Sequence, residues 1–99
     1  LVVDDEPDIR RLVQEILRDE GYDAAIAENA AAARAAYQKR RPDLVLLDIW
    51  MPDTDGISLL KEWAKAGDLP PVVMISGHGT VETAVEAIRI GAYDFIEKP

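Results

Sequence analysis

Acidic, hydroxyl and ammonium side chains stand at the ends of four apolar runs in this chain. Asp4 and Asp5 follow the first run and Asp48 ends the third, while Ser76 and Lys98 lie at the ends of the fourth and fifth. Carboxylates that are held close together repel one another unless a cation joins them. A hydroxyl and an ammonium group beside them could bind the oxygens of an anion. If the fold brings these groups together, they favour metal-assisted chemistry on a phosphoryl group.

The chemistry that this set could perform is phosphoryl transfer to a carboxylate. Mg²⁺ takes oxygen ligands and keeps several of its waters, so the opening acids predict a Mg²⁺ site. Asp48 is the central candidate for a nucleophile that forms an aspartyl phosphate. Lys98 and the metal would neutralise the phosphoryl oxygens, and Ser76 would donate a hydrogen bond to one of them.

Each of these residues also has an ordinary structural interpretation. Asp5 or Glu6 could cap a helix, Asp48 could cap a turn, Ser76 could begin a loop, and Lys98 could be a solvated charge. For any one residue the ordinary role is preferred. The combination of complementary groups at four corresponding points favours the functional interpretation.

The elements that must position these residues follow from hydrophobic periodicity. Pro7 suits a first helical turn, Gly21 ends that helix, and Asn29 and Thr80 are placed to cap later helices. Strands are expected over residues 1–3, 22–27, 43–48, 70–76 and 92–99, and helices over residues 7–20, 29–40, 55–67 and 80–90.

Strands that alternate with helices predict an α/β fold with a doubly wound parallel five-stranded sheet and helices on both faces. The continuous apolar runs within 43–48 and 70–76 are typical of strands buried on both faces. In such sheets ligands bind beyond the carboxyl ends of the strands. The strand order 2-1-3-4-5, taken by analogy with the flavodoxin-like variant of this fold, would place Asp48 at the centre of that edge.

Composition narrows the classes of function. The 99 residues suit one small domain, and 48% hydrophobic with 30% charged residues predicts a soluble globular one. A net charge of −8 disfavours direct binding to nucleic acid or to anionic lipid. Without cysteine, disulfides and thiolate metal sites are excluded, and a cytoplasmic location is the default expectation. The opening Leu1 and the final "EKP" lead us to expect a segment of a longer protein.

Four motifs together resemble one family. The stretches "VVDDE", "LVLLDIWMPDTDG", "VVMISGHG" and "GAYDFIEKP" are similar, in order and nearly end to end, to receiver domains of two-component response regulators, whose fold is CheY-like. The resemblance implies one receiver domain over residues 1–99, with Asp48 as the phosphoacceptor. It further implies that Asp5, Asp48 and the backbone carbonyl of Trp50 bind Mg²⁺, and that Asp4 supports them from behind.

The remaining landmarks of the family also have counterparts. By resemblance, Ser76 is the switch hydroxyl, Lys98 binds the phosphoryl group, and Phe95 occupies the aromatic switch position, although a core Phe on a strand would look the same. Pro99 matches the residue that commonly follows the lysine through a cis bond.

Two further positions match sites that influence how fast this family loses its phosphoryl group. Trp50 and His78 lie two residues after Asp48 and Ser76. They could shield or order the attacking water, although a lone loop histidine is more often simply solvated.

The stretch 75–99 and "DIWMP" resemble the NtrC-type regulators, especially the NtrX branch. That similarity implies a sensor histidine kinase as partner, with a sigma-54-type ATPase and a DNA-binding domain downstream, and a possible homodimer. The expected first strand is short, and the last helix of many receivers is absent from these residues. Plausible kinase contacts, equally well interpreted as solvated helix surface, are Arg10, Arg11, Gln14 and Arg18.

Other functions remain open at this stage. A phosphatase with an aspartate nucleophile would want Asp-x-Asp after the first strand, but the second acid here is Glu6. A flavodoxin-like cofactor module would want hydroxyls and glycines there. A pseudo-receiver, which binds partners without taking phosphate, is the main alternative. The complete set of Asp5, Asp48, Ser76 and Lys98 argues against it.

Overall fold

The fold is seen in a computed structural model, which describes residues 1–67, 69–77 and 81–98. His78, Thr80 and Pro99, for which the sequence suggests roles, lie outside these described residues. The strands are β1 (Val2–Val3), β2 (Ile26–Ala27), β3 (Val45–Asp48), β4 (Val72–Ser76) and β5 (Asp94–Glu97). The helices are α1 (Pro7–Asp19), α2 (Ala30–Lys39), α3 (Gly56–Ala66) and α4 (Val81–Ile90).

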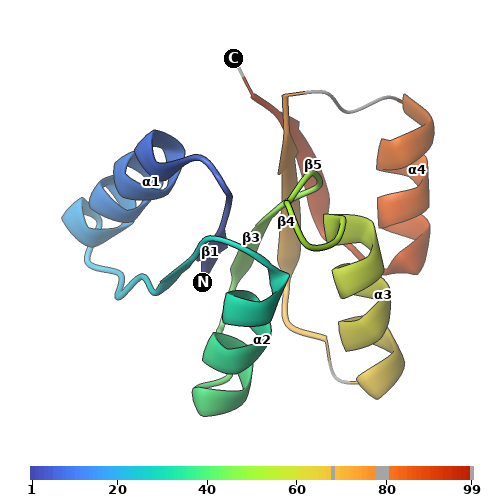
Figure 1. The fold of residues 1–99 in the computed structure, drawn as a ribbon, viewed down its shortest axis with the longest axis horizontal. Coiled ribbons are helices and arrows are strands. Elements are labelled where there is room, and N and C mark those ends of the chain that lie inside the picture. Colours follow the sequence, from blue (N-terminus) through green and yellow to red (C-terminus); the bar gives the residue numbers. More distant parts are fainter. Residues whose placement is uncertain (68, 78–80, 99) are drawn as a thin grey trace.

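The strands form one parallel sheet in the order β2-β1-β3-β4-β5 (Figure 1). The order and the alternation of strands with helices confirm the predicted fold class. Strands β1 and β2 are two residues long, shorter than the runs that suggested them. Hydrogen bonds continue the pairing beyond them, from the Val2 amide to the Ala25 carbonyl at 2.8 Å and from the Asp4 amide to the Ala27 carbonyl at 3.1 Å.

Local sequence signals set the helix boundaries. Pro7 occupies the first turn of α1, and the Asn29 side chain caps α2 by accepting from the Ala32 amide at 2.8 Å, as predicted. Asp55 caps α3 in the same way, through the Ser58 amide at 2.7 Å. Glu6 stands at the N-cap position of α1, but its side chain makes no capping hydrogen bond there. The acids after β1 are therefore available for other contacts.

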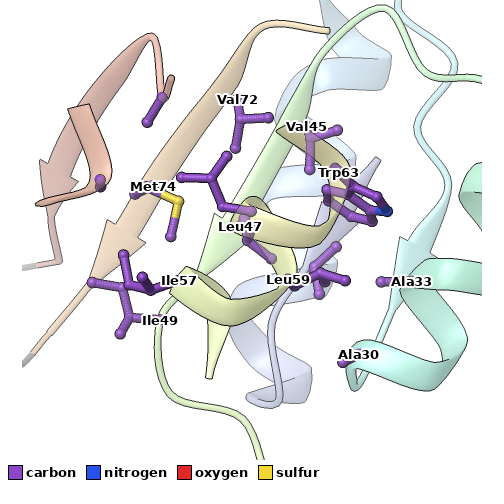
Figure 2. Packing of buried hydrophobic residues seen from close by; sticks show 14 of the residues in the cluster. Ala30, Ala33, Val45, Leu47, Ile49, Ile57, Leu59, Trp63, Val72 and Met74 are labelled. Atoms are coloured by element: carbon purple, nitrogen blue, oxygen red, sulfur yellow. The ribbon is translucent and has the colours of Figure 1, made fainter. Parts of the chain in front are cut away.

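The core lies between the sheet and helices α2, α3 and α4 (Figure 2). Leu47 of β3 and Met74 of β4 are fully buried and pack with Leu59 of α3. The ring of Trp63 in α3 stacks on Tyr37 of α2, with centroids 4.6 Å apart and planes inclined by 14°. Each large side chain buried in this way stabilises the fold by about 1.5–3 kcal/mol. This packing makes α2 and α3 a firm support behind one face of the sheet.

The opposite face of the sheet is less covered than the sequence predicts. Figure 1 shows α1 on the other side of the strands from α3 and α4, and α1 packs on β1 and β2. Leu46, Val73 and Ile75 point to this face and are only partly buried. The expectation that β3 and β4 are buried on both faces is therefore met only in part among the described residues, because α1 covers only the β1 and β2 side of this face.

None of the helices among the described residues is both long enough and apolar enough to span a bilayer.

Candidate functional site

The carboxyl ends of β1, β3, β4 and β5 meet at one edge of the sheet. There the Nζ atom of Lys98 lies 2.9 Å from Asp4 Oδ2, 3.0 Å from Glu6 Oε1 and 3.5 Å from Asp48 Oδ2. Residues from both ends of the chain and from its middle thus share one cluster. The sequence predicted that Asp4, Asp48 and Lys98 would come together, and the structure brings them together.

Asp4 is buried and makes two direct contacts within the cluster. Its side chain is buried, with a relative exposure of 2% for the residue, and it binds Lys98 directly. Its second oxygen, Oδ1, accepts from the Glu6 amide at 2.9 Å, which fixes the turn into α1. A buried carboxylate needs such partners to remain charged. Asp4 therefore ties the beginning of the chain to Lys98.

Asp5 and Glu6 are exposed beside Asp4. One carboxylate oxygen from each of the three acids can be chosen so that all lie within 4.8 Å of one another. Oxygen ligands in this number and of this charge suit a hard cation such as Mg²⁺. The donor set thus fits the metal that the sequence suggested, and Glu6 joins Asp4 and Asp5 in the cluster. The predicted ligand set of Asp5, Asp48 and the Trp50 carbonyl stays a prediction.

Asp48 is destabilised in its charged form. Its relative exposure is 4%. Burial raises the pKa of the Asp48 carboxyl to about 6, and the charges of Asp4 and Asp5 add to the rise, while Lys98 and the Ile49 amide oppose it. A cation placed among these acids would favour the ionised form of Asp48.

Lys98 is held as an ammonium group by its acidic neighbours. Burial by itself would lower the pKa of Lys98, but hydrogen bonds to Asp4 and Glu6 and the nearby carboxylate charges outweigh that effect and raise it. Its backbone amide also donates to the Ser76 carbonyl at 2.8 Å, so the end of β5 is anchored to the end of β4. Lys98 is therefore a fixed positive charge at the centre of the site.

Ser76 and Phe95 lie on the same face of the sheet. Ser76 is fully buried at the end of β4, and Phe95 of β5 pairs with Met74, two residues earlier in β4. Phe95 is partly buried and packs against the core. The hydroxyl and the aromatic ring thus occupy neighbouring strands on the side that α4 covers.

The loop after β3 contains a constraint that the sequence did not reveal. Trp50 is 54% exposed and forms an isolated bridge with Asp55, and the Gly56 amide donates to the Ile49 carbonyl at 2.5 Å. A Cβ atom at Gly56 would collide with the backbone carbonyl of Asp48. A glycine directly after a helix-capping aspartate was the available signal, but only the tertiary structure shows that it must approach Asp48.

The suggested kinase contacts divide into two groups. Arg10 donates to the Asp4 carbonyl at 2.8 Å and Gln14 donates to the Ala24 carbonyl at 2.8 Å, both in part-buried positions. These two side chains hold α1 against the segments that flank β1 and β2, so the alternative interpretation as solvated surface was wrong for them. Their contact with a kinase stays a prediction. Arg11 and Arg18 are exposed.

Comparisons with known proteins show the family of this chain. The family model of the response regulator receiver domain matches residues 1–99. The nitrogen assimilation regulatory protein NtrX of Azorhizobium caulinodans is 56% identical over 101 residues, covering 100% of this chain and 22% of that protein. The chain thus spans about a fifth of the length of this relative.

Solved structures give the same result. The receiver domain of NtrX from Brucella abortus has a TM-score of 0.91 at 59% identity, covering 99% of this chain and 83% of that one. A CheY-like response regulator receiver domain from Methanospirillum hungatei has a TM-score of 0.93 at 33% identity, covering 99% of this chain and 78% of that one. On the match to its whole length and on these similarities, the chain belongs to the family of response regulator receiver domains.

Proposed function

We propose that this receiver domain accepts a phosphoryl group on Asp48 from a sensor histidine kinase, in a reaction that depends on Mg²⁺. The observation that carries the proposal is the cluster in which Lys98 lies within 3.5 Å of Asp4, Glu6 and Asp48. A carboxylate beside a buried ammonium group and two further acids suits a nucleophile that receives an anion only when a cation is present.

Asp5, Asp48 and the Trp50 carbonyl are the proposed metal ligands, with Asp4 behind them. Glu6, which clusters with Asp4 and Asp5, could add a contact through water. When bound, Mg²⁺ would neutralise charge on the phosphoryl oxygens and offset the repulsion among the acids. The raised pKa of Asp48 fits this role, because a cation would keep that side chain ionised and nucleophilic.

The transfer itself needs little from the protein beyond position and charge. A carboxylate oxygen of Asp48 would attack phosphorus, and the bond from phosphorus to the donor nitrogen of a phosphohistidine would break, with the electron pair leaving on that nitrogen. Lys98 would shift from its acidic partners to a phosphoryl oxygen, and Ser76 would donate to another. Transfer to water would reverse the modification, so the chain acts on its own phosphoryl group and not as an enzyme with turnover on other substrates.

The signal would pass through Ser76 and Phe95. As the Ser76 hydroxyl moves toward the phosphoryl group, it would leave space on the face of the sheet that Phe95 shares. The ring of Phe95 would fill that space and change the packing of α4 against β5. A rearranged α4–β5 surface is what a downstream domain or a second receiver could recognise.

The wider setting follows from similarity to NtrX-type regulators. We propose that the output is transcriptional, through a sigma-54-type ATPase and a DNA-binding domain of the same protein, and that a homodimer can form. This segment would not itself bind nucleic acid, since its net charge is −8. A cytoplasmic location stays a prediction.

The deciding experiment is phosphoryl incorporation from acetyl phosphate, with and without MgCl₂, measured by intact mass. Wild-type protein and the Asp48→Asn variant should be compared after circular dichroism shows that both are folded. One added phosphoryl group that requires Mg²⁺ and is missing in the variant would support the proposal. No incorporation by folded wild-type protein would favour the pseudo-receiver, which binds partners without being phosphorylated.

A further inference from the structure

The side chain of Asp53 makes a contact that no motif of the sequence suggests. Asp53 lies in the β3–α3 loop (residues 49–55), yet its Oδ1 accepts from the Ala30 amide and its Oδ2 from the Ala31 amide, each at 3.0 Å. Those two amides begin α2, more than twenty residues earlier in the chain. One carboxylate thus joins the loop that follows Asp48 to the first turn of a neighbouring helix.

The electrostatics of this contact favour a charged Asp53. The Ala30 amide has the largest effect and lowers the pKa of the Asp53 carboxyl; desolvation opposes this, and the Ala31 amide lowers the pKa further. Amides at the start of a helix carry partial positive charge, and their hydrogen bonds to an ionised acceptor are stronger than those between neutral groups. The contact is therefore a charge-assisted pair of hydrogen bonds.

Helix α2 has a cap of its own besides Asp53. Asn29 already occupies the N-cap position and accepts from the Ala32 amide at 2.8 Å. The Ala31 amide is exposed, so water could satisfy it, whereas the Ala30 amide is part-buried. Beyond capping α2, the contact thus attaches the β3–α3 loop to this helix.

Helix α2 is a firm anchor for that loop. Ala30 and Ala33 are fully buried in the core, and Tyr37 stacks on Trp63 of α3. An ion pair of 2.8 Å between Arg34 and Glu62 joins the same two helices. A loop that is bound to the start of α2 is therefore bound to the core of the domain.

The loop is held at three points. Gly56 packs against the Asp48 carbonyl, Asp55 caps α3 and bridges to Trp50, and Asp53 binds α2. The first two contacts close the loop on itself, since Asp55 bridges to Trp50 and the Gly56 amide donates to the Ile49 carbonyl. Asp53 holds the middle of the loop, three residues after Trp50.

We propose that Asp53 is a positioning residue. By binding the start of α2 it holds the β3–α3 loop in a position where the Trp50 carbonyl can bind a cation together with Asp5 and Asp48. The inference rests on the proposed function, because it assumes that Mg²⁺ binds there. Residues that orient metal ligands without touching the metal commonly change metal affinity when they are replaced.

The test compares two residues that cap the same helix. Asp53→Ala removes both contacts from the loop, Asp53→Asn keeps one oxygen acceptor and the shape, and Asn29→Ala removes the cap that α2 makes for itself. Mg²⁺ binding is followed by titrating tryptophan fluorescence with MgCl₂, since Trp50 is exposed in the loop and Trp63 is buried. The Mg²⁺ concentration for half-maximal phosphoryl incorporation from acetyl phosphate is the second readout.

We expect the half-saturating Mg²⁺ concentration to rise about tenfold in Asp53→Ala, less in Asp53→Asn, and not at all in Asn29→Ala. Urea midpoints should fall in both alanine variants, because each removes a cap from α2. Equal Mg²⁺ binding by Asn29→Ala and Asp53→Ala would overturn the inference, since Asp53 would then act only on helix stability. If Asp53→Ala does not fold, the half-saturating Mg²⁺ concentrations of Asp53→Asn and Asn29→Ala are compared instead, and equal values overturn the inference.

The same measurements distinguish failure of the proposed function from failure of the role of Asp53. If wild-type protein neither responds to MgCl₂ nor takes a phosphoryl group, both the proposed function and the role of Asp53 are overturned. If wild-type protein does both and the Asp53 variants match it, only the role of Asp53 is overturned.

Discussion

The ammonium group of Lys98 lies 2.9 Å from the buried carboxylate of Asp4, and this pair joins the last strand of the sheet to the first. The two side chains are 10% and 3% exposed, so neither is well solvated. Phosphoryl transfer to Asp48 would require Lys98 to give up part of this pairing. The resting contact therefore both stabilises the fold and holds the ammonium group ready beside the acceptor.

Removing the ammonium group should cost stability, because Asp4 would be left buried without its counter-charge. We expect Lys98→Met to lower the free energy of unfolding by about 3 kcal/mol, measured by urea denaturation at pH 7.5. Lys61→Met is the matched control, since the Lys61–Glu86 pair is more than half exposed on both sides. Its loss should cost less than about 1 kcal/mol. Equal losses in the two variants would mean that the Lys98–Asp4 pair stabilises the fold no more than an exposed ion pair does.

The raised pKa of Asp48 predicts how stability depends on pH when divalent metal is removed with EDTA. The folded state holds the Asp48 proton up to about pH 6, whereas the ordinary pKa of an Asp carboxyl is 3.8, so folding is weakened as pH rises from about 4 to about 6. Asp48→Asn removes this penalty. It should be more stable than wild type at pH 8, by at most about 3 kcal/mol, and the advantage should disappear below pH 4.

The same pair of proteins tests the cation. MgCl₂ should raise the melting temperature of the wild type more than that of Asp48→Asn at pH 8, because a ligand stabilises the form that it binds. If Asp48→Asn were less stable than wild type at pH 8 in EDTA, the pKa of the Asp48 carboxyl could not be raised in the folded state.

Gly56→Ala should distort the site from its backbone. The added methyl group would collide with the Asp48 carbonyl, and overpacking of this kind costs about 1–3 kcal/mol. We expect lower stability in urea denaturation together with slower phosphoryl incorporation. Gly77→Ala is the control for stability, since a Cβ atom there would lie 3.7 Å from the Lys98 side chain, an ordinary contact. A Gly56→Ala variant with wild-type stability would show that the loop can move away without cost.

Phe95→Ala should separate phosphorylation from its readout. The variant should still take a phosphoryl group, and its stability should fall by about 2 kcal/mol because Phe95 is partly buried. The phosphorylation-dependent change in hydrogen exchange over residues 81–90, measured by mass spectrometry, should be lost. Tyr93→Ala changes a neighbouring aromatic residue that is 76% exposed and should keep that change. A full response in Phe95→Ala would exclude Phe95 as the link to α4.

Much of the fold follows from local patterns. Continuous apolar runs ending in Asp48 and Ser76 indicated buried parallel strands, and Asn29 before an Ala-rich stretch indicated a capped helix. Because parallel strands all end at one edge, the polar residues that end them could be expected to meet. The strand order came from analogy, since periodicity along a chain carries no information about which strands are neighbours.

By itself, then, the sequence determined the class of fold, the order of its elements and the residue types available at the site, because periodicity, caps and turns act over a few residues. Only the tertiary structure decided that Lys98 lies closer to Asp4 and Glu6 than to Asp48, that Gly56 touches the Asp48 carbonyl, and that Asp53 binds α2. The contacts of Lys98 and Asp53 join residues far apart in the chain, the approach of Gly56 to Asp48 depends on the path of the loop between them, and differences of less than an ångström in packing select one partner over another.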